Sequence, residues 1–441
     1  MKRSQLLKRL AWLALAVATL VLALLWLLNT RDETRIVPIT TGSAAAQVSP
    51  DMLVRGEYLT RAGNCMSCHT SRGGEPFAGG RGIETPFGTV FSSNLTPDAK
   101  TGLGTWSRDE FWRALHNGRS QDGRLLYPAF PYTNYTEVTR ADADAMYAYL
   151  QNLPPVSVPV QAHTLRWPFN TQIALAVWRA LYFTPSTFEP EPLQSADWNR
   201  GAYLVRGLGH CSACHSARDS LGGSNQLDMA GGLIPMQNWY APALTENAEA
   251  GLSKWDLKDI VTLFKTGIAP SASVLGPMAE VVRNSTQYMS DDDLRAMAVF
   301  LKSLPPTLHD EAAIPTAARG PKAQAVATSP LARAGAKLYE NNCAQCHGDQ
   351  GQGVAGAYPA LAGNRAVTMA STANLVQIVL NGGYAPATAG NPRPFGMPPF
   401  LLVLSDTEVA SLLTYLRSAW GNQASQVTSF DVNLSRTSNH R

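Results

Sequence analysis

Charged side chains are scarce in this sequence, and neither sign of charge predominates. Of its 441 residues, 36 are Lys or Arg and 33 are Asp or Glu, which gives a formal net charge of +3 at pH 7. No run of Lys or Arg outside the N-terminal segment forms a basic patch, so nucleic acid is not an expected partner. The chain is 45% hydrophobic, as in globular proteins, and its length predicts roughly two to four domains.

The motifs that mark common catalytic sites are also missing. The sequence contains no glycine-rich dinucleotide fingerprint, no nucleotide-binding loop and no catalytic triad that stands out. The alternation of apolar and polar residues that is typical of strands is weak throughout, so we expect a mainly α-helical fold with little sheet. These absences favour a protein that does not itself transform an organic substrate.

No cysteine lies outside a Cys-x-x-Cys pair, and a histidine directly follows each pair. Two cysteines three positions apart can bond the two vinyl groups of one haem, and the next residue then lies beneath the iron, so this is the c-type haem attachment signature. A thioredoxin-like redox pair or half of a zinc site is the alternative for a single copy. Three copies in a repeated frame favour three covalently bound haem c groups, with these attachment cysteines and proximal histidines: Cys65, Cys68 and His69; Cys211, Cys214 and His215; Cys343, Cys346 and His347.

The segments around the three motifs repeat one another. A short amphipathic helix is predicted before each motif, in Arg55-Gly-Glu-Tyr-Leu, Arg200-Gly-Ala-Tyr-Leu and Arg333-Ala-Gly-Ala-Lys-Leu-Tyr. Helices are next predicted over 108–117 and 257–266, ending at the C-cap glycines Gly118 and Gly267. Each unit closes with a helix, over 141–150, 291–301 and 406–416, for which Thr139, Ser290 and Ser405 are the predicted N-caps.

These repeats predict three tandem cytochrome c-type domains behind a membrane anchor. The expected ranges are an anchor over 1–35, domains over 50–155, 195–306 and 330–422, linkers over 156–194 and 307–329, and a tail over 423–441. The first linker holds an apolar stretch at 173–183, which is either a helix packed between domains or a docking face for a partner subunit or the membrane surface. It is too short to span a bilayer.

The N-terminal segment is a predicted transmembrane helix. Lys2, Arg3, Lys8 and Arg9 precede an uncharged apolar run of 19 residues over 10–28, about the length that crosses a hydrocarbon core. The positive-inside rule places the N-terminus in the cytoplasm and the remainder in the periplasm. The alternative is a cleaved signal peptide, but its small-residue cleavage site would lie at 44–46, far beyond the apolar run. We therefore expect an inner-membrane anchor.

Methionines are the expected distal ligands of two haems, since methionine sulfur is a common sixth ligand and raises the reduction potential. The third unit offers Met397 within Phe-Gly-Met-Pro-Pro-Phe, and the second offers Met278 within Leu-Gly-Pro-Met. The first unit has Phe130 at the comparable place, and phenylalanine cannot bind iron. An open or water-bound iron, His116 and Met146 all remain possible there. His163 is a further donor in this unit, and His210 is expected on the surface.

The sequence resembles the three-haem cytochrome c subunits of bacterial membrane-bound dehydrogenases that act on alcohols, aldehydes, gluconate or sorbitol. The resemblance covers nearly everything after the anchor. In that family the residue at 130 is commonly the methionine ligand, so this assignment does not carry over to Phe130. Besides the three haem motifs, the resemblance rests on Asn94-Leu-Thr-Pro-Asp98, Gly102-Leu-Gly-Thr-Trp106, Leu126-Tyr-Pro-Ala-Phe-Pro-Tyr132, Pro242-Ala-Leu-Thr245 and Phe395-Gly-Met-Pro-Pro399.

The resemblance implies an electron-carrier subunit rather than an enzyme. A separate catalytic subunit with a flavin, quinone or molybdenum cofactor would oxidise the substrate in the periplasm, and the three haems would pass its electrons to ubiquinone or an oxidase. Two alternatives stay open. One is a haem enzyme, peroxidase-like or thiosulfate-oxidising, with an open site at the first haem. The other is a free-standing carrier that feeds a terminal oxidase.

Overall fold

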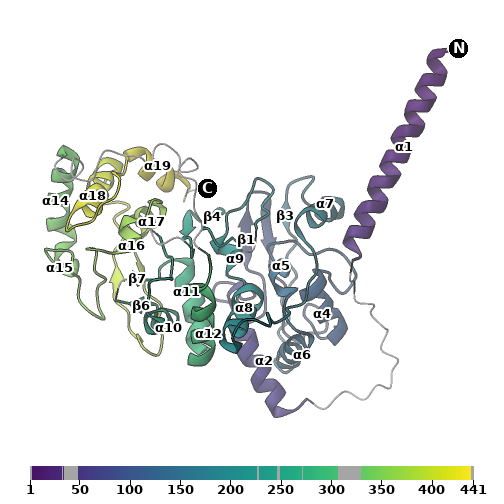
Figure 1. The fold of residues 1–441 in the computed structure, drawn as a ribbon, viewed down its shortest axis with the longest axis horizontal. Helices are drawn as coiled ribbons and strands as arrows, with labels where there is room; N and C mark the ends of the chain where they lie inside the picture. The colour runs from purple at the N-terminus through teal and green to yellow at the C-terminus, as the bar shows by residue number, and fades with distance from the viewer. Residues whose placement is uncertain are drawn as a thin grey trace. The chain divides into compact units, whose positions relative to one another are not determined.

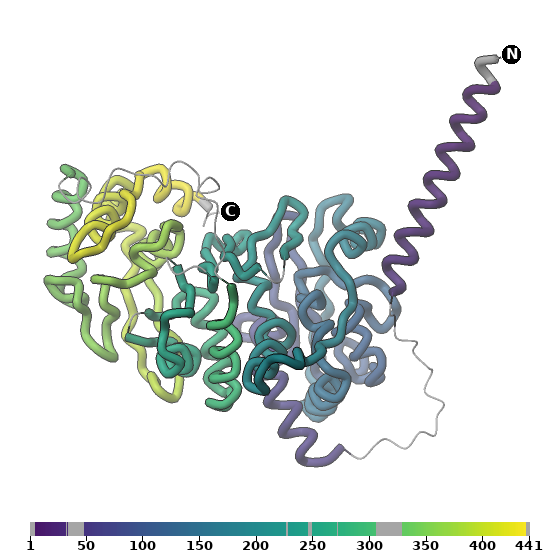
Figure 2. The backbone as a smooth tube through the Cα atoms, viewed as in Figure 1, coloured from purple at the N-terminus to yellow at the C-terminus, as the bar shows by residue number. Residues whose placement is uncertain are grey.

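The computed structural model describes residues 2–31, 33, 48–225, 228–245, 249–270, 272–305 and 329–438. The 44–46 site and nearly all of the 307–329 linker lie outside these residues. The chain divides into two compact units, and Figures 1 and 2 trace its elements. Unit 1 comprises Met1–Glu57, His69–Glu189 and Asp219–Gly223, and unit 2 comprises Tyr58–Cys68, Pro190–Arg218 and Ser224–Arg441.

Unit 1 combines helices with one small sheet. Strands β1, β2 and β3 form a three-stranded antiparallel sheet in that order, with Gly82 opposite Phe91 and Gly88 opposite Leu165. The elements are α1 (Lys2–Asn29), the first part of α2 (Pro50–Ala62), β1 (Gly82–Thr85), β2 (Gly88–Phe91), α4 (Arg108–Asn117), α5 (Tyr132–Tyr135), α6 (Arg140–Gln151), β3 (Thr164–Leu165) and α7 (Gln172–Tyr182).

Unit 2 is mainly helical, and the strands that the structure describes in it pair as two-stranded ladders. Its first half holds α3 (Cys65–Cys68), α8 (Ala196–Ala202), a π-helix (Tyr203–Leu208), α9 (Ser212–His215), β4 (Gly232–Ile234), β5 (Trp239–Ala241), α10 (Leu257–Thr266), β6 (Ile268–Ala269), β7 (Ala272–Ser273), α11 (Pro277–Asn284), a 3-10 turn (Thr286–Tyr288) and α12 (Asp291–Lys302). Its second half holds α14 (Pro330–Asn342), α15 (Ala344–His347), α16 (Arg365–Thr368), α17 (Ala373–Asn381), β8 (Gly383–Tyr384), β9 (Gly396–Met397), α18 (Asp406–Ser418) and α19 (Ser429–Ser438).

The same helix crossing occurs in all three repeats and depends on a glycine. The helix before each haem motif passes so close to the closing helix that a Cβ on the glycine would lie about 2 Å from a carbonyl oxygen of that helix. A larger residue would force the helices apart, which explains the glycine in each repeated segment. The pairs are Gly56 with Ala145, Gly201 with Ala296, and Gly335 with Ser411.

The predicted helix ends are confirmed. Thr139, Ser290 and Ser405 each accept a hydrogen bond from the backbone of the first turn that follows. Gly118 and Gly267 close α4 and α10 in the left-handed conformation, with φ of 58° and 81°. The three closing helices extend one or two residues beyond the predicted ranges, which is the usual variation in where a helix ends.

The helix before the second motif departs from a regular α-helix. From Gly56 to Cys65 is 9 residues, whereas from Gly201 to Cys211 is 10. The extra residue is absorbed in the π-helical turn, where the Gly209 amide donates to the Leu204 carbonyl five residues earlier, at 2.6 Å. Single π-turns typically arise from such one-residue insertions and occur at functional sites. Here the π-helical turn lies between the crossing glycine, Gly201, and the haem motif.

Candidate functional site

Each Cys-x-x-Cys-His motif folds into a single helical turn, which is α3, α9 or α15. In such a turn, side chains three positions apart lie on the same face. The two cysteines of each motif are therefore neighbours, yet none of the six is joined in a disulfide. This arrangement offers two sulfur atoms on one side of the turn, as covalent attachment of a single haem requires.

The thiols lack the properties of a redox dithiol. Burial raises the pKa of Cys65 and Cys211 to about 12, with the neighbouring cysteine as the second cause. The pKa of Cys343 is raised to about 11 for the same reasons. Reactive dithiols have depressed pKa values instead. Within the described residues no group of three or more His, Cys, Asp or Glu could hold a metal ion.

The motif histidines are oriented by backbone carbonyls. Each Nδ1 lies within hydrogen-bond distance of a carbonyl oxygen: His69 of Ser93 at 2.7 Å, His215 of Pro242 at 2.7 Å and His347 of Pro359 at 2.9 Å. A carbonyl can only accept, so Nδ1 carries the proton and Nε2 keeps its lone pair. Burial lowers the pKa of all three histidines, although the carbonyl opposes that shift. A neutral imidazole with a free Nε2 is the form that binds haem iron.

The backbone of each motif histidine is held as well. Its carbonyl accepts a hydrogen bond from a glycine amide: Gly79 to His69 at 2.8 Å, Gly231 to His215 at 2.9 Å and Gly353 to His347 at 2.8 Å. These glycines have φ of 76°, 81° and 66°, which side-chain-bearing residues rarely adopt. A Cβ on any of them would also lie within 2.8 Å of the segment that supplies the Nδ1 acceptor.

A second backbone bond closes the same loop in all three repeats. A leucine amide donates to the residue two positions before the glycine: Leu95 to Phe77 at 2.8 Å, Leu244 to Met229 at 2.9 Å and Leu361 to Gly351 at 2.7 Å. We call this pair of bonds the histidine clasp. Sequence reasoning missed it, although the acceptor and the leucine recur as Ser93-Asn-Leu, Pro242-Ala-Leu and Pro359-Ala-Leu.

The two predicted distal methionines lie in different settings. Met278 follows Pro277 at the start of α11, after Gly276, whose φ is 54° and which abuts the Trp239 ring. Met397 lies in β9, opposite Gly383 of β8, and packs partly buried against the apolar core of the third repeat. The chain after Met397 is fixed where the Phe400 amide donates to Val379 at 3.0 Å. Both methionines thus lie on segments of unit 2 that packing or backbone hydrogen bonds hold in place.

The candidates in the first repeat differ in chemistry. Phe130 packs against the Tyr135 ring at 5.3 Å between centroids. His116 is buried, stacks on Trp112 at 4.6 Å and has Nδ1 2.9 Å from the Thr136 carbonyl, so its Nε2 keeps a lone pair. His163 has the opposite tautomer, because its Nδ1 accepts the Phe91 amide at 3.1 Å. Its Nε2 then carries a proton and is unsuitable as a ligand. The further candidate, Met146, is 1% exposed within α6.

His210, which we expected on the surface, is partly buried instead. Burial lowers its pKa, while a hydrogen bond to the backbone of Gly63 opposes that shift. This bond joins the residue before Cys211 to the segment just before Cys65. The expectation was wrong, because the ring is partly buried and is bonded within unit 2 to a segment distant in sequence.

Comparisons with known proteins match all three repeats to one family. A family model described as cytochrome c matches residues 53–154, 199–305 and 332–420. The chain is 37% identical over 422 residues to the cytochrome c subunit of a quinone alcohol dehydrogenase from Gluconobacter oxydans, covering 91% of this chain and 86% of that one. It is 36% identical over 398 residues to the gluconate 2-dehydrogenase cytochrome c subunit of Pantoea cypripedii, covering 88% and 90%. It is also 38% identical to one subunit of the nicotinate dehydrogenase of Pseudomonas putida, over 95% of this chain but 34% of that protein.

Proposed function

Because the chain belongs to the cytochrome c family and carries three covalently bound haem c groups, we propose that it relays electrons within a membrane-bound periplasmic dehydrogenase complex. The haems supply reversible one-electron redox chemistry, and the protein supplies their position and potential. The chain acts as the electron-carrier subunit, and a partner subunit oxidises the organic substrate. The similar proteins named as subunits of alcohol and gluconate dehydrogenases support this role.

We assign the ligands from the chemistry of the donors. The three cysteine pairs attach the haems, and the Nε2 atoms of His69, His215 and His347 bind the irons from the proximal side. Met278 and Met397 supply distal sulfur to the second and third haems, which raises their potentials. For the first haem the candidates are the buried His116 and Met146.

One observation carries the relay in particular: within unit 2, segments of successive repeats are hydrogen-bonded to one another. Towards the first motif, Ser285 donates to the Ala62 carbonyl at 3.0 Å, and the Asn284 amide donates to Ser67 at 2.8 Å. Such packing keeps consecutive attachment sites in a fixed relation. A protein that passes electrons from haem to haem needs this fixed relation between the haems. Three haem domains that acted independently would not need it.

The second and third repeats are joined in the same manner. The amide of Asn374 in α17 donates to the Tyr240 carbonyl at 2.7 Å and accepts from the Tyr240 amide at 2.8 Å. Arg365 donates to the Gly251 carbonyl at 2.9 Å and lies over the Trp255 ring. These bonds connect β5 and the 251–255 loop of the second repeat with α17 and α16 of the third.

The finer parts of the role follow from the family resemblance and from α1. We propose a catalytic partner of the flavin, quinone or molybdenum type and ubiquinone or an oxidase as the acceptor. Helix α1 includes a candidate membrane span over Gln5–Asn29. We infer that it remains attached and holds the haem domains at the periplasmic face of the inner membrane. Its charge pattern supports this orientation.

Purification from membranes in mild detergent tests the proposal. We expect a large dehydrogenase subunit to copurify, identified by mass spectrometry, and its cofactor then names the substrate class. A cytochrome that is recovered alone from gentle extraction would instead support the free-standing carrier.

A further inference from the structure

Helix α7 buries its charged side chain and exposes apolar ones, the reverse of a helix at the surface of a soluble protein. Its only charged residue, Arg179, is 3% exposed. Its outward stripe is apolar: Ile173, Val177 and Leu181 are 71%, 41% and 62% exposed, and they recur every four residues on one face. Helices at an aqueous surface normally present polar side chains there. An apolar face of this kind usually marks an interaction site.

An exposed tryptophan five residues before α7 strengthens the pattern. Trp167 is 80% exposed, and tryptophan is enriched where membrane meets water. At the other end of the helix, Tyr182 is partly buried and donates to Asp219 at 2.6 Å. The apolar stripe is thus flanked by a side chain suited to the headgroup layer.

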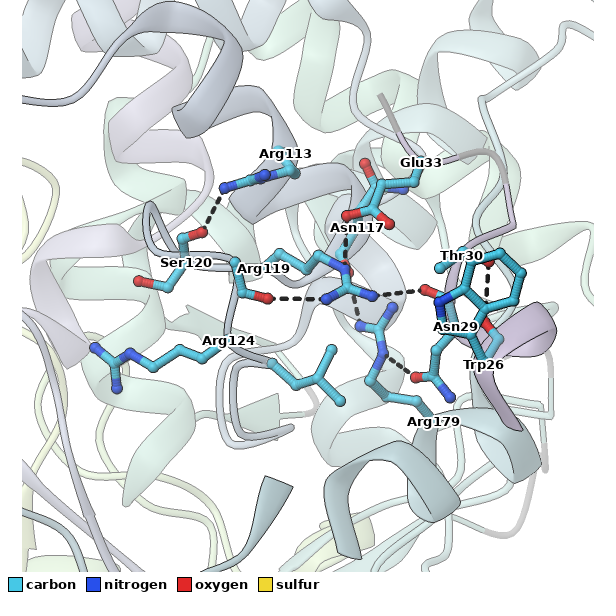
Figure 3. A network of polar contacts seen from close by, with 12 residues as sticks. Trp26, Asn29, Thr30, Glu33, Arg113, Asn117, Arg119, Ser120, Arg124 and Arg179 are labelled. Carbon is cyan, nitrogen blue, oxygen red and sulfur yellow. Dashed lines mark hydrogen bonds and ion pairs between the residues drawn. The ribbon is translucent and has the colours of Figure 1, made fainter. Parts of the chain in front are cut away.

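The end of the membrane helix indicates what covers this stripe. Asn29, the last residue of α1, donates to the Ala176 carbonyl of α7 at 3.0 Å and accepts from Arg179 Nε at 3.0 Å. Arg179 donates also to the Asn117 carbonyl at 2.6 Å. Figure 3 shows Asn29 against the guanidinium groups of Arg119 and Arg179. Helix α1 therefore ends directly on α7.

A second set of bonds fixes this junction to the first repeat. Arg119, which follows the C-cap of α4, donates to the Asn29 carbonyl at 2.9 Å and to the Gly123 carbonyl at 2.8 Å. It also pairs with Glu33 at 2.8 Å. A hinge at this point would lack such bonds. The end of the span and α7 thus move as one body with the first repeat.

The length of α1 determines where its C-terminal end lies relative to the bilayer. The candidate span covers 25 residues, which at ~1.5 Å per residue extends ~38 Å. The hydrocarbon core is only ~30 Å thick, so Asn29 reaches the headgroup layer. Because Asn29 touches α7, that layer is also where α7 lies.

We propose that α7 is an interfacial helix, seated on the phospholipid bilayer with Ile173, Val177 and Leu181 turned towards the acyl chains and Trp167 among the headgroups. This inference rests on the membrane span in the proposed function. It adds a second attachment that fixes the orientation of the first haem domain to the membrane. A face for the dehydrogenase subunit is the competing occupant.

Thiol accessibility distinguishes the occupants. In the full chain, a single cysteine replaces Ile173, Val177 or Leu181. The aqueous control is Val160→Cys, at a site that is 75% exposed. The lipid control is Leu20→Cys, within the membrane span. The purified protein alone is placed in phosphatidylcholine and phosphatidylglycerol liposomes and treated with PEG-maleimide. We expect all three α7 thiols to react at least about tenfold more slowly than the one at Val160, because lipid suppresses the thiolate.

Three outcomes decide the matter. Reaction at α7 as fast as at Val160 would overturn the inference, as would protection that appears only when the catalytic subunit is added. Fast reaction at Leu20 would instead overturn the anchor in the proposed function. A second readout is adduct formation from a phospholipid with a photoreactive acyl chain. We expect adducts on 167–183 and none on 156–163, and the reverse pattern would refute the proposal.

Discussion

Replacing Gly353 by alanine tests whether the histidine clasp orients the iron ligand. The Gly353 amide donates to the His347 carbonyl at 2.8 Å, and its φ is 66°. A Cβ there would lie 2.5 Å from the Tyr358 oxygen, 2.6 Å from the Ala360 nitrogen and 2.7 Å from the Pro359 carbonyl carbon. The last of these belongs to the carbonyl that orients His347, so the substitution pushes directly on the acceptor.

Gly356 is a matched control in the same loop. Its φ is 73°, but a Cβ there would meet nothing within 4 Å. A left-handed backbone costs alanine roughly 1–2 kcal/mol, and forced overlap in a packed site adds roughly 1–3 kcal/mol. We therefore expect Gly356→Ala to destabilise by about 1–2 kcal/mol and Gly353→Ala by about 2–5 kcal/mol.

The effect on the haem distinguishes a role of the clasp in orienting the iron ligand from a general contribution to stability. Partners of a metal-bound histidine tune its basicity and orientation. We expect Gly353→Ala to shift the potential of one haem and to weaken its six-coordinate spectrum, whereas Gly356→Ala leaves both unchanged. Spectroelectrochemical titration and denaturant unfolding measure the two effects. Equal stability and equal haem potentials in the two variants would refute the reasoning.

Three further predictions concern the ligands and the anchor. Met278→Ala and Met397→Ala should each lower the potential of one haem, because thioether ligation favours ferrous iron; if neither variant shifts any potential, the assignments are wrong. Either His116→Ala or Met146→Ala should convert the first haem to a five-coordinate spectrum, and a first haem that is five-coordinate in the unaltered protein would show that neither residue binds it. Replacing 10–28 by a cleavable signal should release a haem-loaded protein on washing, since α7 alone holds far less apolar area than the span; membrane attachment that resists washing would contradict this.

Local chemistry made much of the fold predictable from sequence. The N-caps at Thr139, Ser290 and Ser405 and the C-caps at Gly118 and Gly267 depend on side chains within one turn, so short motifs were sufficient. The helix ranges and the small share of sheet followed from the same patterns. The haem motifs were equally predictable from the sequence, because their residues are adjacent in the chain.

Features that depend on distant contacts were not predictable. The clasp glycine lies 10 residues after His69 but 16 after His215 and 6 after His347, so no fixed spacing reveals it. His210 is hydrogen-bonded to the backbone of Gly63, almost 150 residues earlier. Likewise, nothing local to Asn29 indicates that it meets Arg179. In each case tertiary packing decides the role of a side chain whose neighbours in sequence are uninformative.

Reduction of the haems by substrate in the purified complex tests the central claim most directly. The complex is extracted in mild detergent and the α-band of the c-type haems is followed after the substrate of the copurified dehydrogenase is added. We predict rapid haem reduction in the complex, none in the separated cytochrome chain, and recovery when the catalytic subunit is restored. Reduction of the isolated chain by the organic substrate, or haems that stay oxidised in an active complex, would contradict the account.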